Sequence, residues 1–138
     1  MTTGTTVTTE RVSVAHEGGD RFGIDVRGHH ITVDQPVSAG GMDSAPTPTE
    51  LFVASLAACI GFYARRYLAR HDLPFEGLTV TADFAMASRP SRVGSFEIRL
   101  VLPEGVPADR HEALLAVASH CTVHNTLALP PEVSITLA

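Results

Sequence analysis

The stretch from residue 47 to residue 70, TPTELFVASLAACIGFYARRYLAR, decides the fold of this chain. It opens with the pattern of a helix start, in which Thr47 is the N-cap, Pro48 is the first helical residue and Glu50 completes a capping box. The helix is apolar on nearly all sides over most of its length, and arginines gather near its C-terminal end. Because a helix that is apolar all round must be covered by other elements, we expect a long buried helix running to about Arg70.

Alternating apolar and polar residues predict strands on both sides of this helix. We expect strands at residues 11–16, 22–26 and 31–33 before it, and at residues 77–85 and 95–102 after it. An amphipathic helix, a short helix and a last strand are expected at residues 107–119, 121–127 and 133–137. This order predicts an α+β fold with a mostly antiparallel sheet, in one domain over residues 11–138 that follows a flexible tail at residues 1–10.

The composition of the chain narrows the possible partners and the compartment. The 138 residues are 44% hydrophobic and carry a net charge of -5 without a single lysine, so we expect a globular protein that binds no nucleic acid. The longest uncharged stretch, residues 51–64, would span about 21 Å as a helix, less than the roughly 30 Å of a bilayer core. The threonine-rich opening lacks the apolar core of a signal peptide. We therefore expect a cytoplasmic bacterial protein without a membrane segment.

The chain has two cysteines, Cys59 and Cys121, and each allows more than one interpretation. Their separation of 62 positions (121 − 59) excludes a CxxC redox motif and a zinc-ribbon pair. Cys59 lies inside the apolar helix, where a free thiol is usually inert unless a cation stabilises its thiolate. Cys121 lies at an expected helix N-terminus between His120 and His124, which favours a reactive thiolate. The same three residues could instead bind a metal ion, or mark an ordinary helix start on the surface.

Three short segments together resemble a known family. Residues 46–51 read PTPTEL, residues 54–59 read ASLAAC, and residues 121–127 read CTVHNTL. This arrangement resembles the OsmC/Ohr family, the osmotically inducible protein C and organic hydroperoxide resistance proteins, and within it the broad OsmC-like branch. The resemblance covers the chain from about residue 11 to its end. The third segment more often begins Cys-Pro in this family, whereas here Thr122 follows Cys121.

The resemblance implies an OsmC-like fold and a redox function. It implies an intertwined homodimer with active sites at the subunit interface, and six-stranded antiparallel sheets around the long central helix. It also implies a cofactor-free thiol peroxidase, in which Cys59 attacks the hydroperoxide and Cys121 resolves the resulting sulfenic acid as a disulfide. A dithiol reductant of unknown identity would then reopen that disulfide. Organic hydroperoxides are the expected substrates, because several apolar side chains surround Cys59 in the sequence: Phe52, Leu56, Phe62 and Tyr63.

The resemblance also implies two charged residues that support the thiolate. Arg21 is the best positional match for an arginine from the N-terminal strands, Arg27 is a second candidate, and Glu50 matches the supporting glutamate. Nine positions separate Glu50 from Cys59 (59 − 50), which is about 13.5 Å along a helix and half a turn around it. Glu50 would therefore act through the arginine or on the partner subunit, unless it is a helix cap only.

Two other functions stay open from the sequence. The first is a non-catalytic, stress-associated dimer or binding protein that keeps the fold but has little peroxidase turnover. The second is the metal site at His120, Cys121 and His124, for which a fourth ligand is not evident.

Overall fold

The computed structural model describes residues 9–138, and the chain folds as two compact units, one up to Leu51 and one from Phe52 to Ala138. The tail expected at residues 1–10 falls outside the described residues except for Thr9 and Glu10, which have no regular secondary structure.

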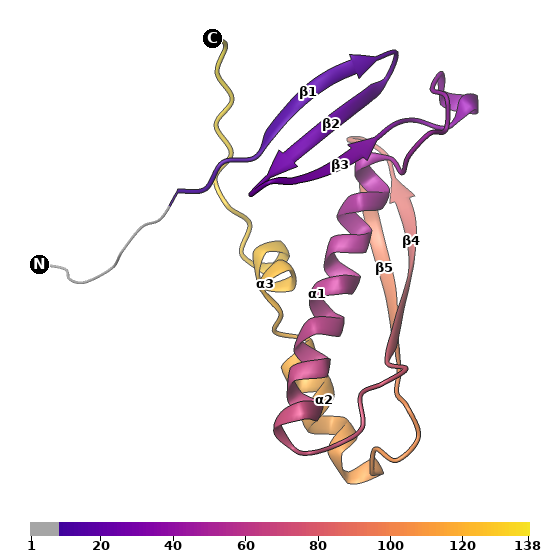
Figure 1. Ribbon diagram of the computed structural model, residues 1–138, viewed down its shortest axis with the longest axis vertical. Helices are drawn as coiled ribbons and strands as arrows, with labels where there is room; N and C mark the ends of the chain where they lie inside the picture. Colours follow the sequence, from indigo (N-terminus) through magenta and orange to yellow (C-terminus); the bar gives the residue numbers. More distant parts are fainter. Residues whose placement is uncertain (1–8) are drawn as a thin grey trace, which may run out of the picture. The chain divides into compact units, whose positions relative to one another are not determined.

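The first unit contains an antiparallel sheet of three consecutive strands (Figure 1): β1 (Ser13–Gly18), β2 (Arg21–Val26) and β3 (His29–Val33). The register places Ile24 of β2 opposite Val14 on one side and Ile31 on the other. The two residues between β2 and β3, Arg27 and Gly28, both have positive φ angles of 49° and 81°. Two such residues make the tight hairpin turn whose twist matches the strands.

The loop after β3 is organised around one buried carboxylate, that of Asp34. The backbone N–H of Asp34 donates to the carbonyl of Pro46 (3.0 Å), which closes a loop containing the short 3-10 helix η1 (Val37–Ala39). The Asp34 carboxylate accepts bonds from the hydroxyl of Ser44 (2.6 Å), the backbone of Ser44 (3.0 Å) and the backbone of Gln35 (2.8 Å). These bonds, the Ser44 hydroxyl first, lower the pKa of Asp34 to about 2. Asp34 is therefore a charged anchor for the whole loop.

The long helix α1 (Pro48–Arg70) begins and ends where the sequence predicts. The Glu50 backbone N–H donates to the Thr47 hydroxyl (3.0 Å), and the Thr47 backbone N–H donates to the Glu50 carboxylate (2.9 Å). This is the reciprocal pair of a capping box, which satisfies two backbone donors at the helix start. Pro48 as the first helical residue is confirmed as well.

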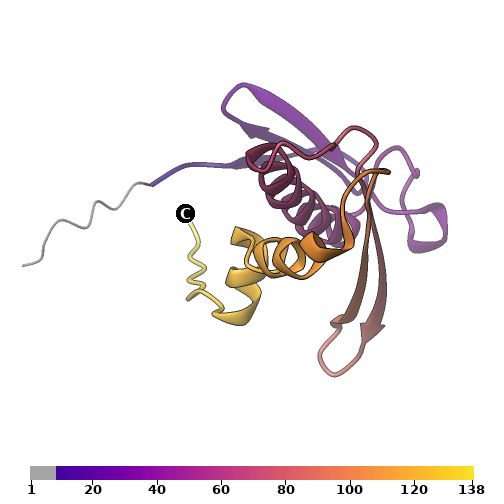
Figure 2. The same cartoon turned by 90° about the horizontal axis from the view of Figure 1, so that it is seen from below.

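In the second unit, α1 packs against a hairpin and two shorter helices. The hairpin strands are β4 (Thr79–Ala87) and β5 (Arg92–Val101), and the helices are α2 (His111–Ala118), preceded by the 3-10 turn η2 (Ala108–Arg110), and α3 (Thr122–Ala128). One stripe of α1, with Leu56, Ile60, Ala64 and Leu68, forms the core together with Leu114 of α2. Alternate residues of the hairpin cover the same stripe. In Figure 2, α2 lies beside α1, and α3 follows next to α2.

This packing covers one stripe of α1, whereas other apolar residues of the helix, such as Phe62, are exposed, so the burial expected on nearly all sides is incomplete in the single chain. By length and mean hydropathy alone the helix could cross a membrane, with a value of 1.3 over 18 residues. Its buried stripe, however, contacts strands and helices of the second unit, as in the core helix of a soluble domain. Two arginines near its C-terminal end lie over aromatic rings, Arg65 over Phe75 and Arg66 over Phe62.

The prediction of a last strand at residues 133–137 is wrong for the single chain. Residues 130–138 have no regular secondary structure, although Val133, Ile135 and Leu137 alternate with polar residues as a strand would. Their side chains are 79%, 89% and 101% exposed, so this segment packs on nothing within the described residues. A strand needs a neighbour for its backbone hydrogen bonds, and none is in reach here. Accordingly, the described sheets have three and two strands rather than six.

Candidate active site

The second unit brings the two cysteines together. Cys59 lies in the middle of α1, and Cys121 is the N-cap of α3, as the sequence predicts. Both are free thiols, Cys59 packs against the buried cluster that contains Cys121, and the nearby Cys59 thiol contributes to raising the pKa of Cys121. Their spacing of 62 positions could not predict that the two cysteines lie close together. It is the packing of α3 on the core around α1 that brings them into one cluster.

The two thiols differ sharply in their access to solvent. Cys121 is fully buried, with 0% of its surface exposed, and belongs to the hydrophobic core around Leu114 and Ala118. Cys59 is only partly buried and lies at the edge of that core. Of the two cysteines, only Cys59 has part of its surface exposed to solvent.

Burial also makes Cys121 a weak acid. Desolvation is the largest cause of its raised pKa, and the neighbouring Cys59 adds to the shift. The backbone N–H of His124 donates to the Cys121 sulfur at 3.3 Å, as at a helix N-cap, and this bond lowers the pKa only partly. Cys121 is therefore a protonated thiol at neutral pH, despite its place at a helix N-terminus.

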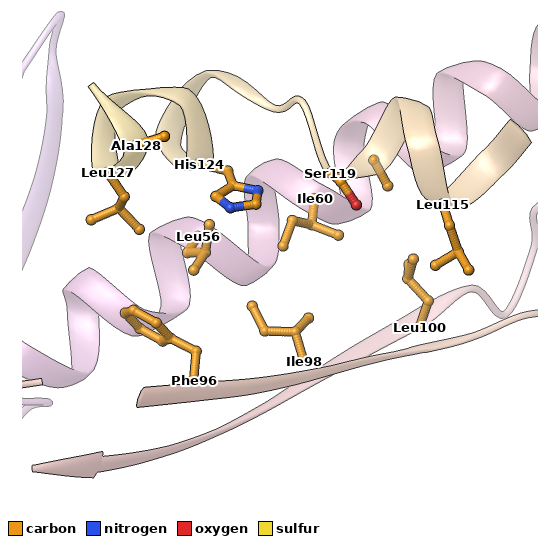
Figure 3. A pocket seen from close by; sticks show the side chains of 11 residues that line it. Leu56, Ile60, Phe96, Ile98, Leu100, Leu115, Ser119, His124, Leu127 and Ala128 are labelled. Carbon is orange, nitrogen blue, oxygen red and sulfur yellow. The ribbon is translucent and has the colours of Figure 1, made fainter. Parts of the chain in front are cut away.

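The histidines beside Cys121 do not activate it with their rings. The His120 ring bonds through Nδ1 to the carbonyl of Ala116 (2.7 Å), and the His124 ring faces a pocket on the core side of α3 (Figure 3). Within residues 9–138, no three side chains of His, Cys, Asp or Glu converge as metal ligands would. The metal site considered for His120, Cys121 and His124 is therefore not formed.

The pocket lies between α1, β5, α2 and α3, and its volume is about 540 Å³ (Figure 3). Its lining is apolar except for two polar side chains, Ser119 and His124. The remaining wall comes from Leu56, Ile60, Phe96, Ile98, Leu100, Leu115, Ala118, Leu127 and Ala128. Neither sulfur lines the pocket, but Leu56 and Ile60 flank Cys59 on α1.

The apolar side chains expected around Cys59 have different roles. Leu56 lines the pocket, whereas Phe52 packs against Phe96 of β5 with ring centroids 5.8 Å apart. Phe62 is 51% exposed. Tyr63 makes a hydrogen bond with the hydroxyl of Thr122 at 3.0 Å, which was not predicted. Most of these side chains therefore pack or lie at the surface rather than form a wall around the thiol.

The charged candidates lie in the first unit, and Arg21 and Glu50 have defined partners there. The Arg21 guanidinium donates to Glu17 (3.1 Å) and to the hydroxyl of Ser44 (2.8 Å), and that hydroxyl in turn donates to the buried Asp34. Glu50 bonds to Thr47 in the capping box instead. The second candidate, Arg27, is exposed at the β2–β3 turn. Of the two arginines, Arg21 is the one whose side chain a network orients.

The comparisons with known proteins agree on one family. The family model described as OsmC-like protein matches residues 41–136. A comparison with curated protein sequences gave no match. Among solved structures, an osmotic stress and detoxification response protein, provisionally so assigned, from Psychrobacter arcticus superposes with a TM-score of 0.79 at 22% identity, covering 90% of this chain and 91% of that one.

Two further solved structures are organic hydroperoxide resistance proteins. The protein from Legionella pneumophila superposes with a TM-score of 0.62 at 22% identity, covering 89% of this chain and 91% of its own. The protein from Elizabethkingia anophelis, with thiocyanate bound, gives 0.68 at 21% identity, covering 88% and 89%. At these identities the likeness shows the fold, while the family match rests on the sequence itself. The chain, with its α+β fold of antiparallel sheets and a long helix, belongs to the OsmC-like protein family.

Proposed function

We propose that this protein is a thiol peroxidase that reduces organic hydroperoxides through Cys59 and Cys121. The observation that carries the proposal is the pair itself: two thiols in one hydrophobic cluster, of which Cys59 is partly exposed to solvent and Cys121 is buried. Membership of a family that includes hydroperoxide resistance proteins supports the same chemistry. The difference in exposure supports Cys59 as the residue that attacks the peroxide and Cys121 as the residue of the second step.

The proposed cycle balances in three steps. The Cys59 sulfur attacks the O–O bond of ROOH, which leaves Cys59 as a sulfenic acid and releases ROH. The Cys121 thiol then attacks the sulfenic sulfur, forming the Cys59–Cys121 disulfide and releasing water. An external dithiol reduces this disulfide and is itself oxidised, which restores both thiols. A cytoplasmic pool of reduced thiols would supply such a reductant.

Arg21 is the residue that we propose to stabilise the Cys59 thiolate. Its guanidinium keeps a fixed positive charge at any relevant pH, which a thiolate at the edge of an apolar core requires. The bonds of Arg21 to Glu17 and to the Ser44–Asp34 pair limit the positions that its side chain can take. Glu50 is a second proposed support, and its present bond to Thr47 means that it would have to leave the capping box to play that part.

The pocket supports a preference for organic over inorganic peroxides. Most of its lining residues are aliphatic or aromatic. Two lining residues, Leu56 and Ile60, belong to the same turns of α1 as Cys59. Apolar groups of a substrate gain free energy on leaving water for such a lining, roughly 0.8 kcal/mol for each buried methylene. A larger kcat/KM for cumene hydroperoxide than for hydrogen peroxide is the expected result. Equal values for the two peroxides would contradict this preference.

We also propose that the active protein is a homodimer. The C-terminal residues Val133, Ile135 and Leu137 have a strand pattern and almost complete exposure, which leaves apolar surface and backbone groups for a second copy to cover. Light scattering should give twice the mass of one chain. A chain truncated after Pro131 should dissociate, whereas a full-length chain that is monomeric at micromolar concentration would refute the proposal.

The proposed reaction is tested by counting thiols. Reduced protein without added reductant should lose two thiols for each molecule of cumene hydroperoxide consumed, and mass spectrometry should show one Cys59–Cys121 disulfide per chain. The Cys59→Ser variant is the matched control, because it keeps the buried thiol and removes the exposed one. Wild-type protein that keeps its thiols in a molar excess of hydroperoxide would favour the alternative, a stress-associated dimer or binding protein with little turnover.

A further inference from the structure

A second pair of side chains joins the two helices that carry the thiols. The hydroxyls of Tyr63 on α1 and Thr122 on α3 lie 3.0 Å apart, within hydrogen-bond distance. Tyr63 follows Cys59 by four residues, so it lies one turn further along the same face of α1. Thr122 directly follows Cys121, the N-cap of α3. The hydroxyl pair and the thiol pair therefore cross the same junction between the two helices, side by side.

Besides the apolar packing of Cys121 and Val123 in the core, the start of α3 has few polar contacts with α1. The helix has seven residues, a length at which an isolated helix is marginal in water. Its other side-chain hydrogen bonds stay within the segment: His124 to the Cys121 sulfur, Asn125 to the His120 carbonyl and Thr126 to the Thr122 carbonyl. Among residues 9–138, the Tyr63–Thr122 bond is the one side-chain hydrogen bond that joins α1 to α3.

We infer that Tyr63 and Thr122 are positioning residues, which hold the Cys121 thiol against Cys59 for closure of the disulfide. This inference rests on the proposed function of the two thiols. Neither hydroxyl takes part in a bond that forms or breaks. In closure, the Cys121 sulfur bonds to the Cys59 sulfenic sulfur, and the oxygen leaves as water. Because closure brings the sulfurs to about 2.05 Å, a fixed α3 start raises the effective concentration of the attacking thiol.

The consequence for function is protection against over-oxidation. A Cys59 sulfenic acid has two fates: attack by Cys121, or attack on a second hydroperoxide that yields the sulfinic acid. Only the first depends on the position of α3. Loss of one net hydrogen bond, worth about 1 kcal/mol, should slow closure by up to about fivefold. The fraction of sulfinic acid at a given peroxide concentration should rise by a similar factor.

The variants Tyr63→Phe and Thr122→Val remove one hydroxyl each and keep the shape of the side chain. Phenylalanine retains the edge contact of residue 63 with the Phe62 ring, whose centroid lies 5.3 Å away. Rapid quenching and mass spectrometry should show sulfenic acid formation at the wild-type rate, slower closure and more sulfinic acid. Disulfide closure in the double variant should be no slower than in either single variant. Thr122→Ser, which keeps a hydroxyl, should close at about the wild-type rate. The control Thr126→Val, which removes a hydroxyl bonded within α3, should leave closure unchanged.

A peroxide-free measurement separates this inference from the peroxidase proposal. Oxidised glutathione converts Cys59 to a mixed disulfide, and attack by Cys121 then releases reduced glutathione and forms the protein disulfide. The release should slow by up to about fivefold in both single variants. If the wild-type protein does not react with hydroperoxides but glutathione release is still slower in the variants, the positioning role is upheld and the peroxidase proposal is refuted. Closure rates unchanged in folded variants, or additive losses in the double variant, would overturn the positioning role.

Discussion

The burial of Cys121 makes disulfide closure the pH-dependent step of the proposed cycle. The attacking species is the thiolate, and desolvation raises the pKa of Cys121 above that of a free thiol, which is about 8.5. At pH 7 the thiolate fraction is therefore below about 3%. Because the folded-state pKa lies above the whole range from pH 6 to pH 8, the closure rate should rise about tenfold per pH unit, or about a hundredfold over that range.

The assay uses the Cys59 mixed disulfide with glutathione, so that peroxide chemistry does not enter. Release of glutathione is followed at each pH from 6 to 9, and the Cys121→Ser variant, which lacks the attacking thiol, supplies the background rate. A plateau below pH 8 would refute the reasoning, because it would show that Cys121 is already ionised. In that case the His124 backbone bond to the sulfur would outweigh burial, and Cys121 would have to be considered as the peroxide-attacking residue.

Three further predictions follow from the same geometry. Cys59→Ser should abolish hydroperoxide consumption, whereas Cys121→Ser should consume about one equivalent and then accumulate sulfinic acid on Cys59. Sulfinic acid found on Cys121 in the wild-type protein would reverse the roles of the two cysteines. Glu50→Ala should lower the free energy of unfolding by about 1 kcal/mol through loss of the capping box, and a drop of tenfold or more in peroxide reactivity would show that Glu50 also supports the thiolate. The free energy of unfolding should fall as the pH rises above about 8.5, because the unfolded Cys121 thiol ionises there while the folded one stays protonated; Cys121→Ser should remove that part of the decline, as thermal melts at each pH can measure.

Local features of the fold were predictable because their causes are local. Thr47 and Glu50 satisfy each other's backbone donors whatever the rest of the chain does, so their spacing alone marks the start of α1. The Arg27–Gly28 turn and the N-cap role of Cys121 are decided by neighbouring residues in the same way. The stripe of apolar side chains along α1 predicts that this face of the helix is buried in a core. It does not predict which elements pack against it.

The candidate site was less predictable because its contacts join distant residues. The resemblance to a family, rather than spacing, suggested that Cys59 and Cys121 meet. Nothing in the sequence singled out the bond between Tyr63 and Thr122, which are 59 positions apart. Local reasoning about Cys121 pointed to a reactive thiolate, and it erred because burial, the larger cause, depends on the packing of the whole second unit.

The C-terminal segment shows a different limit, since its sequence pattern is that of a strand but the described residues give it no neighbouring strand. The alternation of Val133, Ile135 and Leu137 is that of a half-buried strand, and the described residues leave all three in solvent. A sequence pattern records which face of a segment is to be buried, but not against which molecule. A monomer would gain nothing from such a face, and would expose an edge prone to uncontrolled pairing. These apolar residues would therefore destabilise an isolated chain in water and stabilise a dimer that buries them. For this reason the oligomeric state and the reactivity of the thiols should be measured on the same full-length protein.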